Sequence, residues 1–191
     1  MTKKKIDDLR IMIQRMIYVR SLESFDALFE PDLEPIEKQY SQFAQEAEKD
    51  GRTVTFRGLY SYSFKELSDY PIITPFILAQ TPEEIQGLES GNLVGKIYEE
   101  HRRASVKGTI GHPELSFVKK YTEGVAPHFL ENLAKLLAKC LYPGSGRMNP
   151  QDITYSAQYV PNNEQYKGEW SFEDKKSPIN NHGKFVLKKI N

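Results

Sequence analysis

The sequence predicts an α+β protein with a mainly α-helical body of about five helices and a short C-terminal antiparallel β-meander. Apolar residues recur at helical spacing near the N-terminus and again between residues 129 and 140. After residue 152 they alternate at period two, the spacing of a strand with one buried face. We therefore expect a helical domain over residues 1–143 and a β-ribbon over residues 144–191 that packs on it.

The first two helices are expected before residue 50. Ile6, Leu9 and Ile13 recur at helical spacing, and the prolines of the following FEPDLEP segment interrupt that pattern. A second helix is expected from Pro35 to Lys49, with its end marked by the Asp-Gly pair that follows.

Residues 52–56 (RTVTF) are expected to form a short strand, and helices are expected to start near Ser63 and Thr81. At both starts a Ser or Thr precedes a Glu by three residues, which is the spacing of a capping box. Pro82 occupies the first helical position of the second case, where proline is favoured. The apolar run YPIITPFILAQ between the two is expected to be buried, and helix and strand both stay open for it.

Further helices are expected between residues 94 and 142. Glu99 and Arg103 have the i, i+4 spacing of an ion pair along a helix. Another helix is expected to start near Pro113, and the strongest amphipathic pattern of the chain runs from residue 129 to residue 140.

The C-terminal β-ribbon is expected to contain three strands separated by turn residues. In each strand the apolar side chains fall on one face: Ile153, Tyr155, Ala157 and Tyr159 in the first, Trp170 and Phe172 in the second, Phe185 and Leu187 in the third. So small a ribbon needs another layer to cover its aromatic face.

The composition limits the possible functions. The 26 basic and 26 acidic residues give no net charge, which argues against a freestanding nucleic-acid binder. No apolar run approaches the roughly 20 residues needed to span a bilayer. The single cysteine, Cys140, excludes an internal disulfide, so a reducing, cytoplasmic location is expected. No cofactor or metal is expected, because no two of the four histidines stand three or four residues apart.

The charges are distributed unevenly along the chain. Residues 1–20 contain six basic and two acidic side chains, whereas residues 21–50 contain two basic and nine acidic ones. Such segregation suits a protein with one face for an anion and another for a protein partner, and it also arises by chance in a neutral chain.

We expect a non-catalytic subunit or adaptor of a larger assembly that has protein partners and contacts a DNA or RNA backbone through basic helices. The candidate nucleic-acid-binding residues are Lys3, Lys4, Lys5, Arg10, Arg15, Arg102, Arg103, Lys107, Lys119, Lys120 and Arg147. In general character such a protein is similar to the helical small subunits of CRISPR-type effector complexes, a likeness that no motif carries.

The aromatic residues of the ribbon allow two interpretations. Tyr155, Tyr159, Tyr166 and Trp170 are interleaved with lysines, as in stacking platforms for single-stranded nucleic acid. Small β-meanders also use aromatic side chains simply to build a core.

Two other functions stay open. Asp152 and the pair Glu173 and Lys175 fit a Mg-dependent nuclease of the restriction-enzyme type, in which carboxylates on neighbouring strands hold the metal and the lysine stabilises charge at the phosphate. The same pattern arises by chance in a chain with 27% charged residues. The second alternative is a protein-only interaction adaptor, favoured by the 11 tyrosines, which are common at interfaces.

Overall fold

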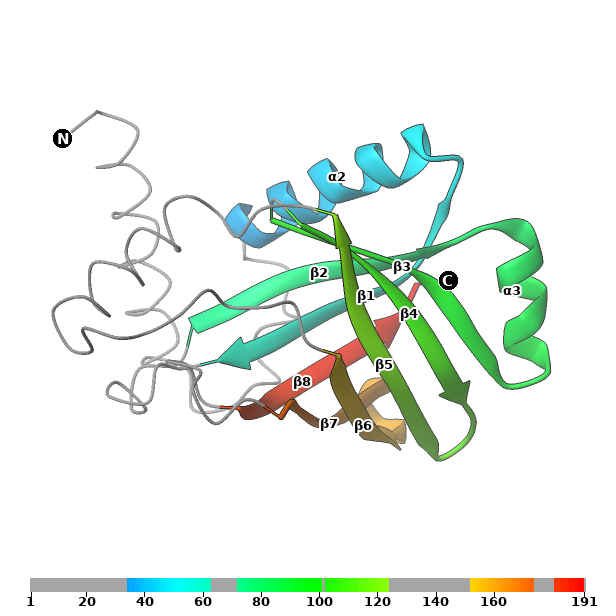
Figure 1. Ribbon diagram of the computed structural model, residues 1–191, viewed down its shortest axis with the longest axis vertical. Helices are drawn as coiled ribbons and strands as arrows, with labels where there is room; N and C mark the ends of the chain where they lie inside the picture. Colours follow the sequence, from blue (N-terminus) through cyan, green and yellow to red (C-terminus); the bar gives the residue numbers. More distant parts are fainter. Residues whose placement is uncertain (1–33, 63–71, 101, 124–151, 174–180, 191) are drawn as a thin grey trace, which may run out of the picture.

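The computed structural model describes residues 34–62, 72–100, 102–123, 152–173 and 181–190. Within these residues, eight antiparallel strands form a closed barrel in which each strand pairs with its neighbours in the chain (Figure 1). The strands are β1 (Thr53–Tyr62), β2 (Ile72–Gln80), β3 (Asn92–Glu99), β4 (Arg102–Ile110), β5 (Glu114–Glu123), β6 (Ile153–Val160), β7 (Gln165–Ser171) and β8 (His182–Lys189). Pairing between β1 and β8 closes the barrel, so no strand keeps an unpaired edge.

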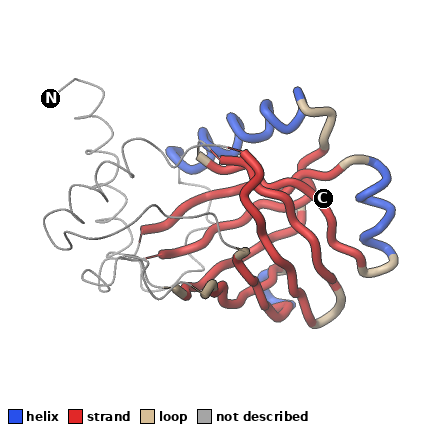
Figure 2. The backbone as a smooth tube through the Cα atoms, viewed as in Figure 1, coloured by secondary structure: helices blue, strands red, loops and turns tan. Residues whose placement is uncertain are grey.

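The predicted fold class is wrong, because the described chain is mainly β-structure. Two α-helices occur among the described residues, α2 (Glu34–Lys49) and α3 (Pro82–Glu89), and both lie outside the barrel (Figure 2). The described residues therefore do not form the helical body on which the likeness to CRISPR-type small subunits rested. None of the helices in the described part of the chain is long and apolar enough to cross a membrane.

The helices expected near Glu99 and Pro113 are strands β3, β4 and β5. Glu99 and Arg103 do not face each other along a helix: they lie on two antiparallel strands, with Glu99 paired to Arg102. The i, i+4 spacing was misleading because the pairing of β3 with β4 also brings such residues close together. The helices expected at residues 3–22, after Ser63 and at 129–140 lie outside the described residues.

The three C-terminal strands confirm the part of the prediction that rested on period-two alternation. β6, β7 and β8 pair in order and antiparallel, as a meander does. Their apolar faces point into the barrel, and the other five strands provide the layer that covers them. The expected domain boundary between residues 143 and 144 lies outside the described residues.

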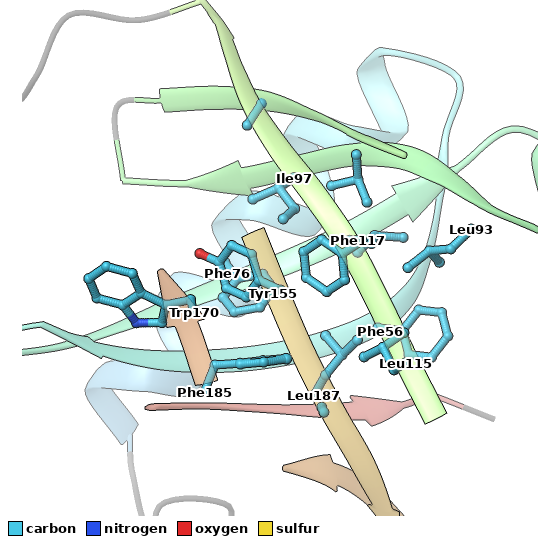
Figure 3. Close-up of a cluster of buried hydrophobic side chains, with 14 residues drawn as sticks. Phe56, Phe76, Leu93, Ile97, Leu115, Phe117, Tyr155, Trp170, Phe185 and Leu187 are labelled. Carbon is cyan, nitrogen blue, oxygen red and sulfur yellow. The ribbon is translucent and has the colours of Figure 1, made fainter. Parts of the chain in front are cut away.

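Aromatic side chains fill the middle of the barrel (Figure 3). Phe117 and Tyr155 stack with ring centroids 4.5 Å apart, and Phe185 meets Tyr155 edge-on at 4.9 Å. Glycines on neighbouring strands make room for these rings. A methyl group on Gly58 would lie 2.2 Å from the Phe76 ring across the strand pair. The barrel centre is consequently a packed core, and space for a ligand has to be sought at its two ends.

Helix α2 covers the outer face of β1, β2 and β3, as Figure 1 shows. Phe43 and Ala47 on the helix pack against the outward side chains Ile77 and Tyr98 of the sheet. The strand β2 is thus buried on both faces, since its inward side chains join the barrel core. This explains why its sequence, IITPFILAQ, is almost continuously apolar and showed no alternation.

The helix predicted to start at Thr81 is confirmed as α3. The Thr81 hydroxyl accepts a hydrogen bond from the Glu84 backbone N–H, and the Glu84 carboxylate accepts one from the Thr81 N–H. The short strand predicted at residues 52–56 and the helix predicted from Pro35 to Lys49 are also confirmed, as β1 and α2.

Candidate binding sites at the two ends of the barrel

A buried ion pair lies inside one end of the barrel. Lys119 on β5 donates from Nζ to the Glu99 carboxylate on β3 across 2.6 Å. Both side chains occupy inward positions of their strands and are almost fully enclosed, with exposed fractions of 1% and 2%. Charged residues are rarely buried to this degree unless they are paired, and even a paired group has lost its hydration.

Aromatic rings surround the Lys119 ammonium. Its Nζ lies 4.8 Å from the centroid of the Tyr60 ring and 4.6 Å from that of Tyr121. These ring faces offer electron density to a cation that water no longer solvates. Burial on its own lowers the pKa of Lys119, but the Glu99 carboxylate outweighs this and holds that pKa above its usual range. Lys119 is therefore an ammonium ion and not a nucleophilic amine.

One oxygen of Glu99 has no hydrogen-bond partner. Burial on its own raises the pKa of Glu99, but the Lys119 charge and its hydrogen bond keep that pKa below its usual range. The lone pairs of Oε2 are used by Lys119, whereas Oε1 is buried and accepts no hydrogen bond. The Tyr121 hydroxyl helps to lower the pKa of Glu99 without forming a hydrogen bond of normal geometry to Oε1. Burying a carboxylate oxygen without a hydrogen bond costs free energy, because the oxygen has lost its hydrogen bonds to water and accepts none from the protein.

Arg102 places a second cation at the same end of the barrel. It is the first residue of β4 and lies directly across the strand pair from Glu99. Its half-buried guanidinium lies over the Tyr121 ring, 5.0 Å from the centroid. Among the described residues Arg102 forms no ion pair. We refer to Glu99, Arg102, Lys119, Tyr60 and Tyr121 as the polar cluster; its charged groups carry one net positive charge.

A pocket of about 380 Å³ lies at the opposite end of the barrel. Phe56, Leu88 and Ile110 form its apolar wall, and Tyr159 and Tyr166 form an aromatic one. Two charged side chains, Glu164 and Lys189, also line it. The volume lies within the range of about 300–1,000 Å³ that is typical of small-molecule sites.

The basic residues predicted on one helix lie on strand β4 and point in different directions. Arg102 belongs to the polar cluster inside the barrel, and Arg103 points outward and pairs with Glu46 of α2. Lys107 is exposed on the outer face. The three residues therefore do not form one basic surface.

The predicted pair Lys119 and Lys120 is divided in the same way. Lys119 is buried inside the barrel, whereas Lys120 is exposed and lies 3.8 Å from Asp152. The remaining candidates for phosphate contact lie outside the described residues: Lys3, Lys4, Lys5, Arg10, Arg15 and Arg147.

The residues of the nuclease alternative fall partly within the described chain. Asp152 precedes β6 and Glu173 follows β7, and both are exposed. These two strands pair with Thr154 opposite Ser171, so both carboxylates lie just beyond the same end of one strand pair. Lys175 lies outside the described residues, and no group of three or more potential metal ligands occurs within them.

The aromatic residues considered as a stacking platform are part of the interior. Tyr155 and Trp170 belong to the barrel core, and Tyr166 packs against it. Tyr159 lies half-buried in the pocket wall. The core interpretation of these residues is the one that the geometry supports.

Sequence reasoning missed Glu99 as a functional residue, together with Tyr60 and Tyr121. A signal was present in the RASVKGTI segment, where Ala104, Val106 and Ile110 alternate with polar residues at period two. Extending that alternation backward places Arg102 inside the barrel. No such signal marks Glu99, because its neighbour Tyr98 is also buried, beneath α2.

The chain matches no protein-family model, and no curated protein is significantly similar to it.

Proposed function

We propose that the protein is a non-catalytic binding protein whose polar cluster takes up a small anion that also carries a hydrogen-bond donor. The observation that supports this most directly is the presence of two groups at one end of the barrel: a buried Glu99 oxygen that accepts no hydrogen bond of normal geometry, and an Arg102 guanidinium that forms no ion pair with any described residue. The two residues are partners across the β3–β4 strand pair, which places both groups at the same end of the barrel.

The charges of the polar cluster favour an anion. Lys119 pairs with Glu99, and within the described ranges no carboxylate forms an ion pair with Arg102. A guanidinium presents several N–H groups in a plane and binds oxyanions in a defined orientation. The anion must also bring a donor, because a fully deprotonated oxyanion would meet the lone pairs of Glu99 Oε1 and be repelled.

Matched pairs of small anions test this proposal by isothermal titration calorimetry. Inorganic phosphate and glycolate each combine a negative charge with an O–H group in slightly acidic buffer, whereas sulfate and acetate do not. We expect phosphate or glycolate to bind and its partner lacking the O–H group to bind at least about tenfold more weakly, since hydrogen bonds to charged groups contribute roughly 1.5–3 kcal/mol. Binding by one donor-bearing anion and not the other identifies which anion shape the site accepts.

Two variants make the measurement specific. Arg102→Gln removes the free cation and is expected to abolish binding, whereas Lys120→Gln removes an exposed outward-facing cation and is expected to leave the affinity unchanged. The proposal is wrong if none of the four anions binds, or if sulfate and acetate bind as tightly as phosphate and glycolate. In either case the free Glu99 oxygen is explained by an internal water molecule.

The role as a subunit contacting protein partners and a nucleic-acid backbone stays a second proposal. Lys107 and Lys120 support it, because both are exposed on the outer face of the neighbouring strands β4 and β5. Binding of DNA or RNA that weakens steeply with salt, and that weakens further in Lys107→Gln, would support it. Absence of binding at low salt would remove it. The cytoplasmic location expected from the single cysteine likewise stays a prediction.

A further inference from the structure

We propose that the pocket at the opposite end of the barrel is a second, independent binding site for a free amino acid with an apolar side chain. This inference does not depend on the polar cluster. It rests on the shape of the pocket, on two charges of opposite sign in its lining that form no ion pair with another described residue, and on an unusual backbone conformation at one of them.

The wall of the pocket is suited to an apolar side chain. Leu88 from α3 and Ile110 from β4 contribute partly exposed carbon surface, and the fully buried Phe56 from β1 lies behind them. Burying a side chain such as that of leucine against these groups is favourable by about 1.5–3 kcal/mol.

The aromatic side of the pocket is held rigidly. The Tyr166 hydroxyl donates to the Gly111 carbonyl across 3.0 Å, and the Tyr159 and Tyr166 rings meet edge-to-face at 5.2 Å. The His112 ring packs on Tyr159 with centroids 4.6 Å apart. A wall fixed by such contacts loses little conformational entropy when a ligand binds.

Glu164 and Lys189 place two opposite charges in the lining of the pocket. Gln165 pairs with Lys188 in the β7–β8 ladder, so Glu164 and Lys189 are the next two residues beyond that pair and lie at the same end of it. Despite this proximity they form no ion pair with each other, and both side chains are exposed. Each charge is thus available to a ligand that brings the complementary group.

The backbone at Glu164 supports a role for this side chain. Its φ is 51°, in the left-handed region that glycine or asparagine usually occupies. A larger side chain in this conformation is a local cost, and such costs are concentrated at binding sites. Glycine would relieve the strain but would remove the carboxylate from the pocket.

A zwitterion with an apolar side chain satisfies all of these features together. Its carboxylate pairs with the Lys189 ammonium, its ammonium pairs with the Glu164 carboxylate, and its side chain covers the apolar wall. A simple fatty acid or an apolar amine would leave one of the two charges without a partner.

The test compares L-leucine with two analogues that carry the same isobutyl group, using isothermal titration calorimetry on the full chain. 4-Methylpentanoate lacks the amine, and 3-methylbutylamine lacks the carboxylate. We expect leucine to bind at least about tenfold more tightly than either analogue, because each analogue loses one charge-assisted hydrogen bond.

Two variants test whether Lys189 and Glu164 bind the carboxylate and the ammonium group of leucine. Lys189→Gln and Glu164→Gln are each expected to weaken leucine binding about tenfold. Their matched controls, Lys188→Gln and Glu169→Gln, alter exposed residues on the same two strands and are expected to change nothing. Thermal unfolding of all four variants shows whether each is folded.

Three outcomes would overturn the inference: no binding of leucine, equal affinity for leucine and either analogue, or full affinity in both pocket variants.

Competition with phosphate and glycolate separates this site from the polar cluster. We expect leucine to bind unchanged in their presence and in the Arg102→Gln variant. Loss of leucine binding there would assign both ligands to one site and would also overturn the proposal of a second site.

Discussion

Two ion pairs, each between a glutamate and a basic side chain, lie in opposite environments in this protein. Glu99 and Lys119 meet inside the barrel, where both side chains are almost completely enclosed. Glu37 and Arg57 meet on the outer surface between α2 and β1, 3.1 Å apart, with 49% and 42% of their side chains exposed. The separations are similar, but the contributions of the two pairs to stability are not.

Solvent accounts for the difference. An exposed pair is screened by water and loses side-chain freedom on forming, so its typical contribution is about 0–1 kcal/mol. A buried pair attracts more strongly, but both of its charges have been removed from water, and removing one partner leaves the other without compensation. Removing one partner of the buried pair is therefore strongly destabilising, although the intact pair contributes little net stability.

Breaking the interior pair is expected to have the largest effect. Lys119→Met should lower the free energy of unfolding by about 3–5 kcal/mol, because it leaves the Glu99 carboxylate buried without its cation. Chemical denaturation of the purified variant measures this directly.

The matched control removes both charges together. Lys119→Met combined with Glu99→Leu should recover most of the lost stability, since the apolar side chains have similar volumes and need no hydration. A double variant as unstable as the single one would contradict this account. So would a single variant that loses less than about 1 kcal/mol.

The interior pair should make the free energy of unfolding of the unmodified protein depend on pH in the acidic range. The pKa of Glu99 is lower in the folded chain than its usual value of 4.5, so folding is favoured by its ionisation above that pH. This contribution is lost as the pH falls from 4.5 through the folded pKa, because over that interval the unfolded chain takes up the proton more readily than the folded one. The double variant lacks the group and should lose stability less steeply over the same pH interval. Equal slopes in the two denaturation series would refute the prediction.

Substitutions in the surface pair should lower the free energy of unfolding least. Arg57→Gln is expected to lower the free energy of unfolding by less than about 1 kcal/mol, and by less still at high salt. Arg57 also lies over the Tyr40 ring, 5.1 Å from its centroid, so Glu37→Gln is the cleaner comparison for the charge alone. A loss comparable with that of Lys119→Met would show that burial is not what separates the two pairs.

Local sequence signals predicted the elements whose stability is decided locally. The capping box at Thr81 marks the start of α3, and the period-two pattern after residue 152 marks β6, β7 and β8. The prediction failed between residues 92 and 123, where β3 is partly buried on both faces and carries a charged residue inward. Those departures from alternation resembled the spacing of a helix.

The candidate sites were less predictable than the strands. Arg102 and Lys119 were chosen from the sequence as surface cations for phosphate contact, yet both point into the barrel. The alternation that places them there was overlooked, because these segments were interpreted as helices, in which period two has no meaning. Glu164 and Lys189 were not singled out, since they are adjacent only through the β7–β8 register.

The sequence by itself determined where several strands and helices form, because capping and alternation act within a few neighbouring residues. Only the tertiary structure decided that the sheet closes on itself, since β1 and β8 pair across more than a hundred intervening residues. Closure also decided which charged side chains are buried. A closed barrel has an interior, and side chains that alternate inward are enclosed there whatever their polarity, which is how Glu99 and Lys119 came to be buried together.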